Sequence, residues 1–163
     1  MSMIGYFLAV KPERGEELAH DPAAVGTFVH EAIEDQDELG QDFLDLDKSW
    51  QAIHFLLTGD VEGGDAPLAW AVLAPTTIGE DLGYGPARLL SPDEVTEVSK
   101  ALAPITADKM KRRFNKETLN ERNVYPNAWR ADDADYIAEN FTQLKKLYES
   151  AARRRMSIVQ WIS

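Results

Sequence analysis

The chain is organised around residues 48–59, which read KSWQAIHFLLTG and show a helical pattern of apolar and polar positions. At about 100° per residue, apolar side chains cover most of a helical circumference here. The polar positions form one narrow strip, which consists of Gln51, His54 and Thr58. A carboxylate at Asp45 or Asp47 suits the start of such a helix, and Gly59 suits a left-handed end. Because a helix that is apolar almost all round is buried, residues 48–58 are predicted to form a central helix about which the chain packs.

Strands are predicted at both ends of the chain. Residues 3–10 and 157–162 are apolar and rich in β-prone side chains, and residues 87–90 read as a further short strand. Residues 76–86 contain three glycines and are expected to form a tight, shaped loop. Helices are predicted elsewhere from start signals such as proline and Ser/Thr/Asp caps, at Pro12, Asp21–Pro22, Ser91–Glu94, Thr106 and Asp132. This pattern predicts a helix-rich α/β fold, in which a small mixed β-sheet is layered with helices.

Several motifs resemble those of a known family. The segments 44–50 (LDLDKSW) and 54–59 (HFLLTG) are similar to the signature of the YfbM-like family of bacterial domains of unknown function. The similarity continues through MIGYF at 3–7, GYGPAR at 83–88, and Val124–Pro126 with Trp129. It covers nearly the whole chain and implies a single α/β layered domain over residues 1–163. It implies no activity.

Composition narrows the protein class. The 163 residues are 44% apolar and 9% aromatic, which is typical of a globular domain. There is no cysteine, so disulfides, thiolate zinc sites and a cysteine nucleophile are excluded. The chain start lacks the features of a signal peptide, and no apolar run approaches a membrane span, so we expect a soluble, cytoplasmic protein. No cofactor is indicated.

Charge is unevenly distributed along this acidic chain, whose net charge is −11. Residues 1–47 carry −10, residues 48–105 carry −5, and residues 106–163 carry +4. Five carboxylates cluster between Glu31 and Glu38, but they lack the spacing of a calcium loop, and a solvated acidic face is the preferred interpretation. The basic segments 109–116 and 153–155 could contact phosphates, but the net charge disfavours nucleic acid. They could equally pair with the acidic first third inside the fold.

The candidate ligand-binding residues are amphipathic aromatics with a histidine and an arginine: Trp50, His54, Tyr84, Arg88, Tyr125 and Trp129. Tyrosine and tryptophan suit pocket walls because each joins an apolar body to a polar tip. The same side chains equally suit a core that satisfies loop backbone, and His54 suits a buried histidine with one hydrogen bond. No catalytic motif is present, so no catalytic residue is assigned.

Two functions remain open on these observations. The acidic first third, with no catalytic set, favours a non-enzymatic binding or regulatory module that acts on a protein partner. The alternative is a small-ligand pocket or an unassigned enzyme centred on His54 with Tyr84, Arg88, Tyr125 and Trp129. The oligomeric state is open.

Overall fold

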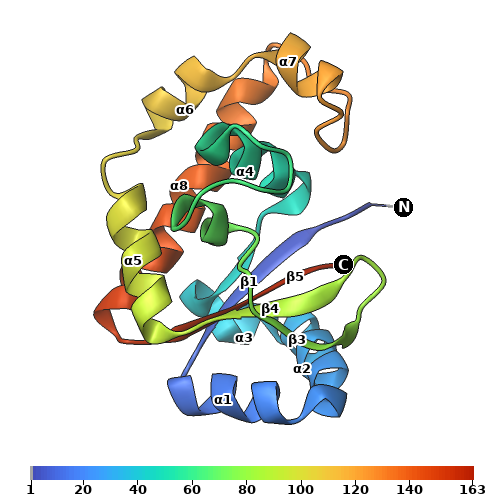
Figure 1. Cartoon of the computed structure of the whole chain (residues 1–163), viewed down its shortest axis with the longest axis vertical. Coiled ribbons are helices and arrows are strands. Elements are labelled where there is room, and N and C mark those ends of the chain that lie inside the picture. The colour runs from blue at the N-terminus through green and yellow to red at the C-terminus, as the bar shows by residue number, and fades with distance from the viewer. Residues whose placement is uncertain (1) are drawn as a thin grey trace.

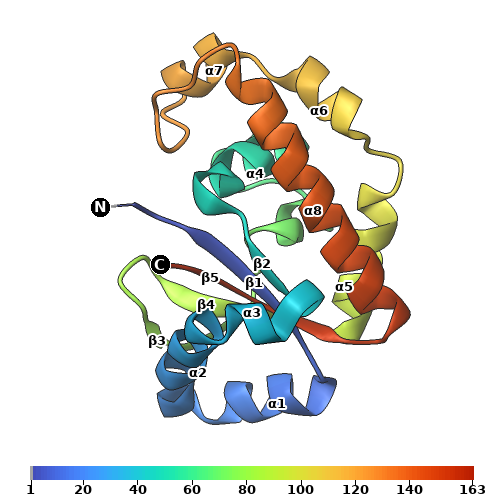
Figure 2. The same cartoon turned by 180° about the vertical axis from the view of Figure 1, so that it is seen from behind.

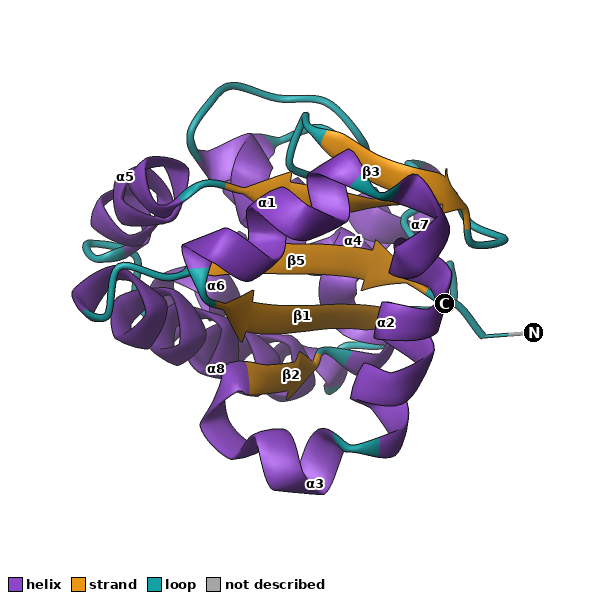
Figure 3. Cartoon of the chain, turned by 90° about the horizontal axis from the view of Figure 1, so that it is seen from below, coloured by secondary structure: helices purple, strands orange, loops and turns teal. Residues whose placement is uncertain are grey.

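The two ends of the chain meet in the middle of one β-sheet. In the computed structural model, which describes residues 2–163, β1 (Gly5–Val10) and β5 (Ser157–Ile162) pair along their full lengths. The other strands extend the sheet in the order β2-β1-β5-β4-β3 (Figure 3), with bounds Phe43–Asp45 for β2, Pro86–Leu90 for β4 and Thr77–Asp81 for β3. The sheet with its helices confirms the predicted α/β fold. Every strand pairing is antiparallel, so the sheet itself is not a mixture of parallel and antiparallel strands.

One face of the sheet is covered by the N-terminal helices α1 (Pro12–His20) and α2 (Pro22–Glu34), as Figure 3 shows. Alternate strand residues point to this face because side chains alternate along a strand. They meet helix residues in an apolar cluster that includes Leu8, Val159, Val25 and Val29. The short helix α3 (Gln36–Leu39) and the 3-10 turn η1 (Gly40–Asp42) then lead into β2.

The opposite face carries the larger helical layer, across which α8 (Asp133–Arg153) runs in Figure 2. Figure 1 shows this layer on the other side of the sheet from α1 and α2. Its remaining members are α4 (Trp50–Thr58), the 3-10 turn η3 (Leu68–Ala71), α5 (Pro92–Leu102), α6 (Ala107–Arg113) and α7 (Lys116–Glu121). Ser91 and Glu94 form the predicted capping box of α5. None of the helices among residues 2–163 is both long and apolar enough to span a bilayer.

The predicted central helix is α4, and it is buried as expected. Seven of its nine residues are buried, including Gln51 and His54 of the polar strip. Gly59 ends it with φ 78°, as predicted. Its start differs: a 3-10 turn, η2 (Asp47–Ser49), precedes it, and no side chain caps it. Asp47 is unsuitable as a cap because its backbone is left-handed, with φ 50°, and its carboxylate accepts a hydrogen bond from the Tyr136 hydroxyl at 2.7 Å.

Two further expectations have clear outcomes. The glycine-rich segment 76–86 contains the strand β3 and is not only a loop, because its extended half pairs with β4 before the turn. The arginines that follow α8 pair within the fold: Arg154 forms an ion pair with Asp42, and Arg155 forms one with Asp93 at 2.8 Å. These two arginines therefore serve internal contacts, which weakens the nucleic-acid interpretation of that segment.

Candidate ligand-binding cleft

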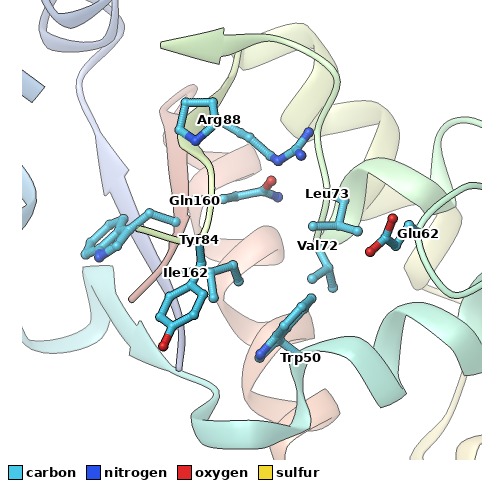
Figure 4. A pocket seen from close by; sticks show the side chains of 10 residues that line it. Trp50, Glu62, Val72, Leu73, Tyr84, Arg88, Gln160 and Ile162 are labelled. Carbon is cyan, nitrogen blue, oxygen red and sulfur yellow. The ribbon is translucent and has the colours of Figure 1, made fainter. Parts of the chain in front are cut away.

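A cleft of about 300 Å³ opens between Trp50 of α4 and the ends of β4 and β5 (Figure 4). Its walls come from α4, the loop after α4, the segment after η3, the β3–β4 turn, and the ends of β4 and β5. We call it the Arg88 cleft, after its central cation, and its principal lining residues are Trp50, Glu62, Leu73, Tyr84, Arg88 and Gln160. This volume lies at the lower end of small-molecule sites, about 300–1,000 Å³.

Arg88 is the cation of the cleft. It stands on β4 opposite Gln160 of β5, on the sheet face that α4 covers. One guanidinium nitrogen, Nη1, donates to the carbonyl oxygen of Ala74 at 2.6 Å. Among residues 2–163, no carboxylate forms an ion pair with it. Because a guanidinium has five N–H donors, most of its hydrogen-bonding capacity is left for solvent or a ligand.

Trp50 forms the wall that lies across the cleft from Arg88 in Figure 4. Its indole Nε1 donates to the Met3 carbonyl at 3.0 Å, and its ring stacks on Tyr125 with centroids 6.1 Å apart. Gly5 makes this position possible, because a Cβ there would lie 2.7 Å from Cβ of Trp50. The indole is therefore held in place beside the start of β1.

Gln160 ties β5 to the segment 70–74, which forms another wall of the cleft. It is 1% exposed, and its amide makes several hydrogen bonds to the segment that carries Val72 and Leu73. Its Oε1 accepts from Ala74 N at 2.9 Å, and its Nε2 donates to the Trp70 carbonyl at 2.8 Å. Nε2 also lies 3.0 Å from the hydroxyl of Tyr148, which itself bonds to the Ala71 carbonyl. A segment with little regular structure is thereby fixed by buried side chains.

Glu62 lies on the loop that follows α4, and His54 holds that loop. His54 is fully buried, and its Nε2 lies 2.7 Å from the Gly63 carbonyl, so Nε2 is the protonated ring nitrogen. Asp60 Oδ1 accepts from the backbone N–H groups of Glu62 and Gly63, at 3.1 and 2.9 Å. These two bonds lower the pKa of Asp60. The Glu62 side chain forms no ion pair with a described residue.

Burial lowers the pKa of His54 below its usual value, and the positive charge of Arg88 adds to this effect. The Gly63 carbonyl, Asp60 and Glu62 oppose it. The other ring nitrogen, Nδ1, is buried without a hydrogen-bond partner among the described residues. His54 is thus a neutral structural histidine behind the cleft, and it does not line it.

Tyr84 stands at the mouth of the cleft, on the turn between β3 and β4. It is 38% exposed, and it is the one large hydrophobic residue that is exposed among residues 2–163. Asp81 Oδ1 shapes the turn by accepting from Gly83 N at 2.6 Å and Gly85 N at 3.2 Å. Both glycines have positive φ, a conformation that other residues rarely adopt.

The structure brings together three of the six residues predicted from the sequence. Trp50, Tyr84 and Arg88 line the Arg88 cleft. Tyr125 lies behind Trp50, where its hydroxyl accepts from Met3 N at 2.9 Å. Trp129 is buried in the loop before α8, where its indole donates to the Val124 carbonyl at 3.0 Å. His54 is buried, with one hydrogen bond to the Gly63 carbonyl, and it is not among the residues that line this cleft.

Sequence reasoning missed two polar residues of the cleft, Glu62 and Gln160. Gln160 had a detectable signal, since it is the single polar residue within the apolar run IVQWI. Glu62 had none, because one carboxylate in an acidic loop cannot be distinguished from its neighbours. The five carboxylates between Glu31 and Glu38 are all exposed. Among residues 2–163, no three or more histidine, aspartate or glutamate side chains are grouped so that they could hold a metal ion.

Comparison with known proteins places this chain in a family. Residues 1–161 match the model of a domain of unknown function, DUF1877. The chain therefore belongs to this family of uncharacterised domains, which confirms the resemblance seen in its motifs.

Two relatives extend this result. The chain is 28% identical to Protein YfbM of Escherichia coli (strain K12) over 162 residues, which covers 96% of this chain and 92% of that protein. The crystal structure of a protein of unknown function, YfbM from Escherichia coli, matches with a TM-score of 0.68 and 22% identity, over 98% of this chain and 99% of that one. At this identity the structural match establishes the shared fold.

Proposed function

We propose that this protein is a binding module whose recognition element is the Arg88 cleft, and that the cleft takes a small molecule with an anionic group. The observation that supports this most directly is the guanidinium of Arg88, which faces a concave site with one protein acceptor and no ion pair. A planar guanidinium binds carboxylate or phosphate through two parallel hydrogen bonds.

The rigidity of the cleft also supports binding. Trp50, the segment 70–74 and the loop of Glu62 are each fixed by hydrogen bonds that exist without a ligand. A preformed site loses little conformational entropy on binding, which favours affinity for a small molecule. The exposed ring of Tyr84 would cover part of such a ligand at the mouth.

The test is a thermal-shift screen of small carboxylates and phosphates, followed by amide chemical-shift mapping of each hit. We expect hits to shift the amide resonances of residues 72–74, 84–88 and 160–162. Their affinity should fall at least tenfold in Arg88→Lys, which keeps the positive charge but loses the planar guanidinium that donates two parallel hydrogen bonds. Arg153→Lys, an exposed arginine at the end of α8, is the matched control. Tyr84→Ala tests the mouth without disturbing the core. Hits that bind Arg88→Lys and wild type equally would contradict the proposal.

A protein partner is the second candidate, and the acidic surface of α2 and α3 favours it. Its carboxylates at Glu31, Glu34, Asp35, Asp37 and Glu38 are exposed, and none pairs with a described lysine or arginine. A regulatory role on a basic partner would use this surface. Capture of a stoichiometric partner at low salt, lost when these five residues are changed to amides, would support it. Equal capture by both forms would count against it.

A further inference from the structure

We infer that the ligand of the Arg88 cleft is a small zwitterion, with a carboxylate at Arg88, an ammonium group at Glu62 and an apolar body against Trp50. This inference rests on the proposed function, because it specifies the chemistry of the ligand in the same cleft. It follows from two features of the walls: a pair of opposite charges that do not pair with each other, and the apolar surface around them.

The two charges are the first feature. Arg88 and Glu62 both line the cleft, yet they form no ion pair with each other or with any other described residue. The Arg88 guanidinium is anchored by the Ala74 carbonyl, and Asp60 holds the backbone of the loop that carries the exposed Glu62 carboxylate. Opposite charges that line one site without pairing match a ligand that carries the complementary charges at its two ends.

A simple anion fits these charges less well. Bound at Arg88, it would leave Glu62 unpaired and would add a like charge to the same partly enclosed space, which is unfavourable. A simple cation at Glu62 would face Arg88 in the same way. A dipolar ion supplies a partner for each charge and leaves the cleft neutral.

The apolar surface defines the rest of the ligand. In Figure 4, Val72 and Leu73 lie on one side of the cleft, and Ile162 and the Tyr84 ring lie on the other. The indole of Trp50 closes the end opposite Arg88. A flat or branched apolar group fits between these walls, because indole and phenol rings bury large areas in contact with such groups. An α-amino acid with an apolar or aromatic side chain has this combination of groups.

Three probes that share one phenyl ring and chain separate the charges. Phenylalanine has both charges, 3-phenylpropionate lacks the ammonium, and 2-phenylethylamine lacks the carboxylate. Calorimetry with the full chain should give the tightest binding for phenylalanine, with a loss of about tenfold or more for each of the other two. In Glu62→Gln, phenylalanine should weaken to the level of 3-phenylpropionate, while 3-phenylpropionate should bind no more weakly than to wild type.

Glu62→Gln is expected to fold, because the side chain is exposed and makes no hydrogen bond or ion pair to a described residue. Glu97→Gln, an exposed glutamate on α5, is the matched control and should bind all three probes as wild type does. Binding of 3-phenylpropionate as tight as that of phenylalanine, or a Glu62→Gln variant with unchanged affinity for phenylalanine, would overturn the zwitterion inference. The proposed function would survive that result if the bound probe still required Arg88. If no probe binds, the inference fails, and the proposed function then stands or falls on whether the wider screen gives an Arg88-dependent hit.

Discussion

The two faces of the sheet are packed by different kinds of contact. On the α1/α2 face, β5 contributes Val159 and Trp161 to an apolar cluster, and Trp161 stacks on Tyr6 at 5.5 Å between ring centroids. On the α4/α8 face, the same strand contributes Gln160, whose amide oxygen and nitrogen are both hydrogen-bonded. Successive residues of one strand therefore serve an apolar core and a polar network.

The Arg88 cleft lies on the face that carries the polar network. Regular helices seal the α1/α2 face without help from buried polar side chains of the helices. On the other face, polar side chains hold irregular segments: buried His54 and exposed Asp60 hold the loop 60–64, while buried Gln160 and half-buried Arg88 hold the segment 70–74. The Arg88 cleft lies among these irregular segments, with Glu62 on one and Val72 and Leu73 on the other.

The largest effect that tests this comparison is expected from Gln160→Leu. Leucine has a similar volume, so the loss of stability arises from the hydrogen bonds that are removed. Without them, the Ala74 N–H and the Trp70 carbonyl no longer have their Gln160 partner. We expect a fall of about 2–4 kcal/mol in the free energy of unfolding, measured by urea denaturation. Val159→Ala, the neighbouring change on the apolar face, should cost about 1–2 kcal/mol. A Gln160→Leu variant as stable as wild type would show that the polar network contributes nothing to stability.

The elements of the fold could be predicted wherever local rules determined them. Helix α1 begins at Pro12 and β5 covers Ser157–Ile162, as the sequence pattern indicated. The capping box at Ser91 and the end of α4 at Gly59 were also predictable, because each depends on residues within one turn. The start of α4 was not, since a contact with Tyr136, 89 residues away, holds Asp47 in its left-handed conformation.

The cleft was predictable only in part, for the same physical reason. Residue type identified Trp50, Tyr84 and Arg88 as candidates, but chemical type cannot separate a wall residue from a core residue. Trp129 and Trp50 are both buried tryptophans with a bonded indole nitrogen, and only the tertiary arrangement places one of them at a cavity. For His54 the sequence left a core and a pocket position open, because its partner, the Gly63 carbonyl, is a backbone group that no side-chain pattern reveals.

A pair of glycine substitutions should sharpen the comparison with effects of opposite sign. In Gly5→Ala, the new Cβ would lie 2.7 Å from Trp50, on the α4 face. Such crowding costs about 1–3 kcal/mol. In Gly26→Ala, on the exposed surface of α2, the new Cβ meets nothing within 4 Å. Replacing an interior helical glycine by alanine stabilises by about 0.5–1 kcal/mol.

Thermal and urea denaturation of both glycine variants measure these changes. A neutral Gly5→Ala would mean that Trp50 moves freely, and the rigid wall assigned to the Arg88 cleft would then be wrong. A destabilising Gly26→Ala would show that the α2 surface is more constrained than its open surroundings indicate.

The smallest expected effect is a pH dependence from His54, which separates the polar network from surface histidines. Burial lowers the pKa of His54 in the folded state, so between that pKa and the unfolded value of about 6.5 the unfolded chain binds more protons. Stability should therefore fall as the pH is lowered through about 6.5, and it should stop falling below the folded pKa.

His54→Gln removes this component, whereas His20→Gln, at an exposed residue, should keep it. The difference in unfolding free energy between each variant and wild type, followed from about pH 7.5 to 5, isolates the histidine from the carboxylates that titrate at lower pH. An identical pH slope in wild type and His54→Gln would mean that the ring accepts a proton in the folded state without cost. Its unpaired Nδ1 would then have to reach water, and the loop that carries Glu62 would be looser than its hydrogen bonds indicate.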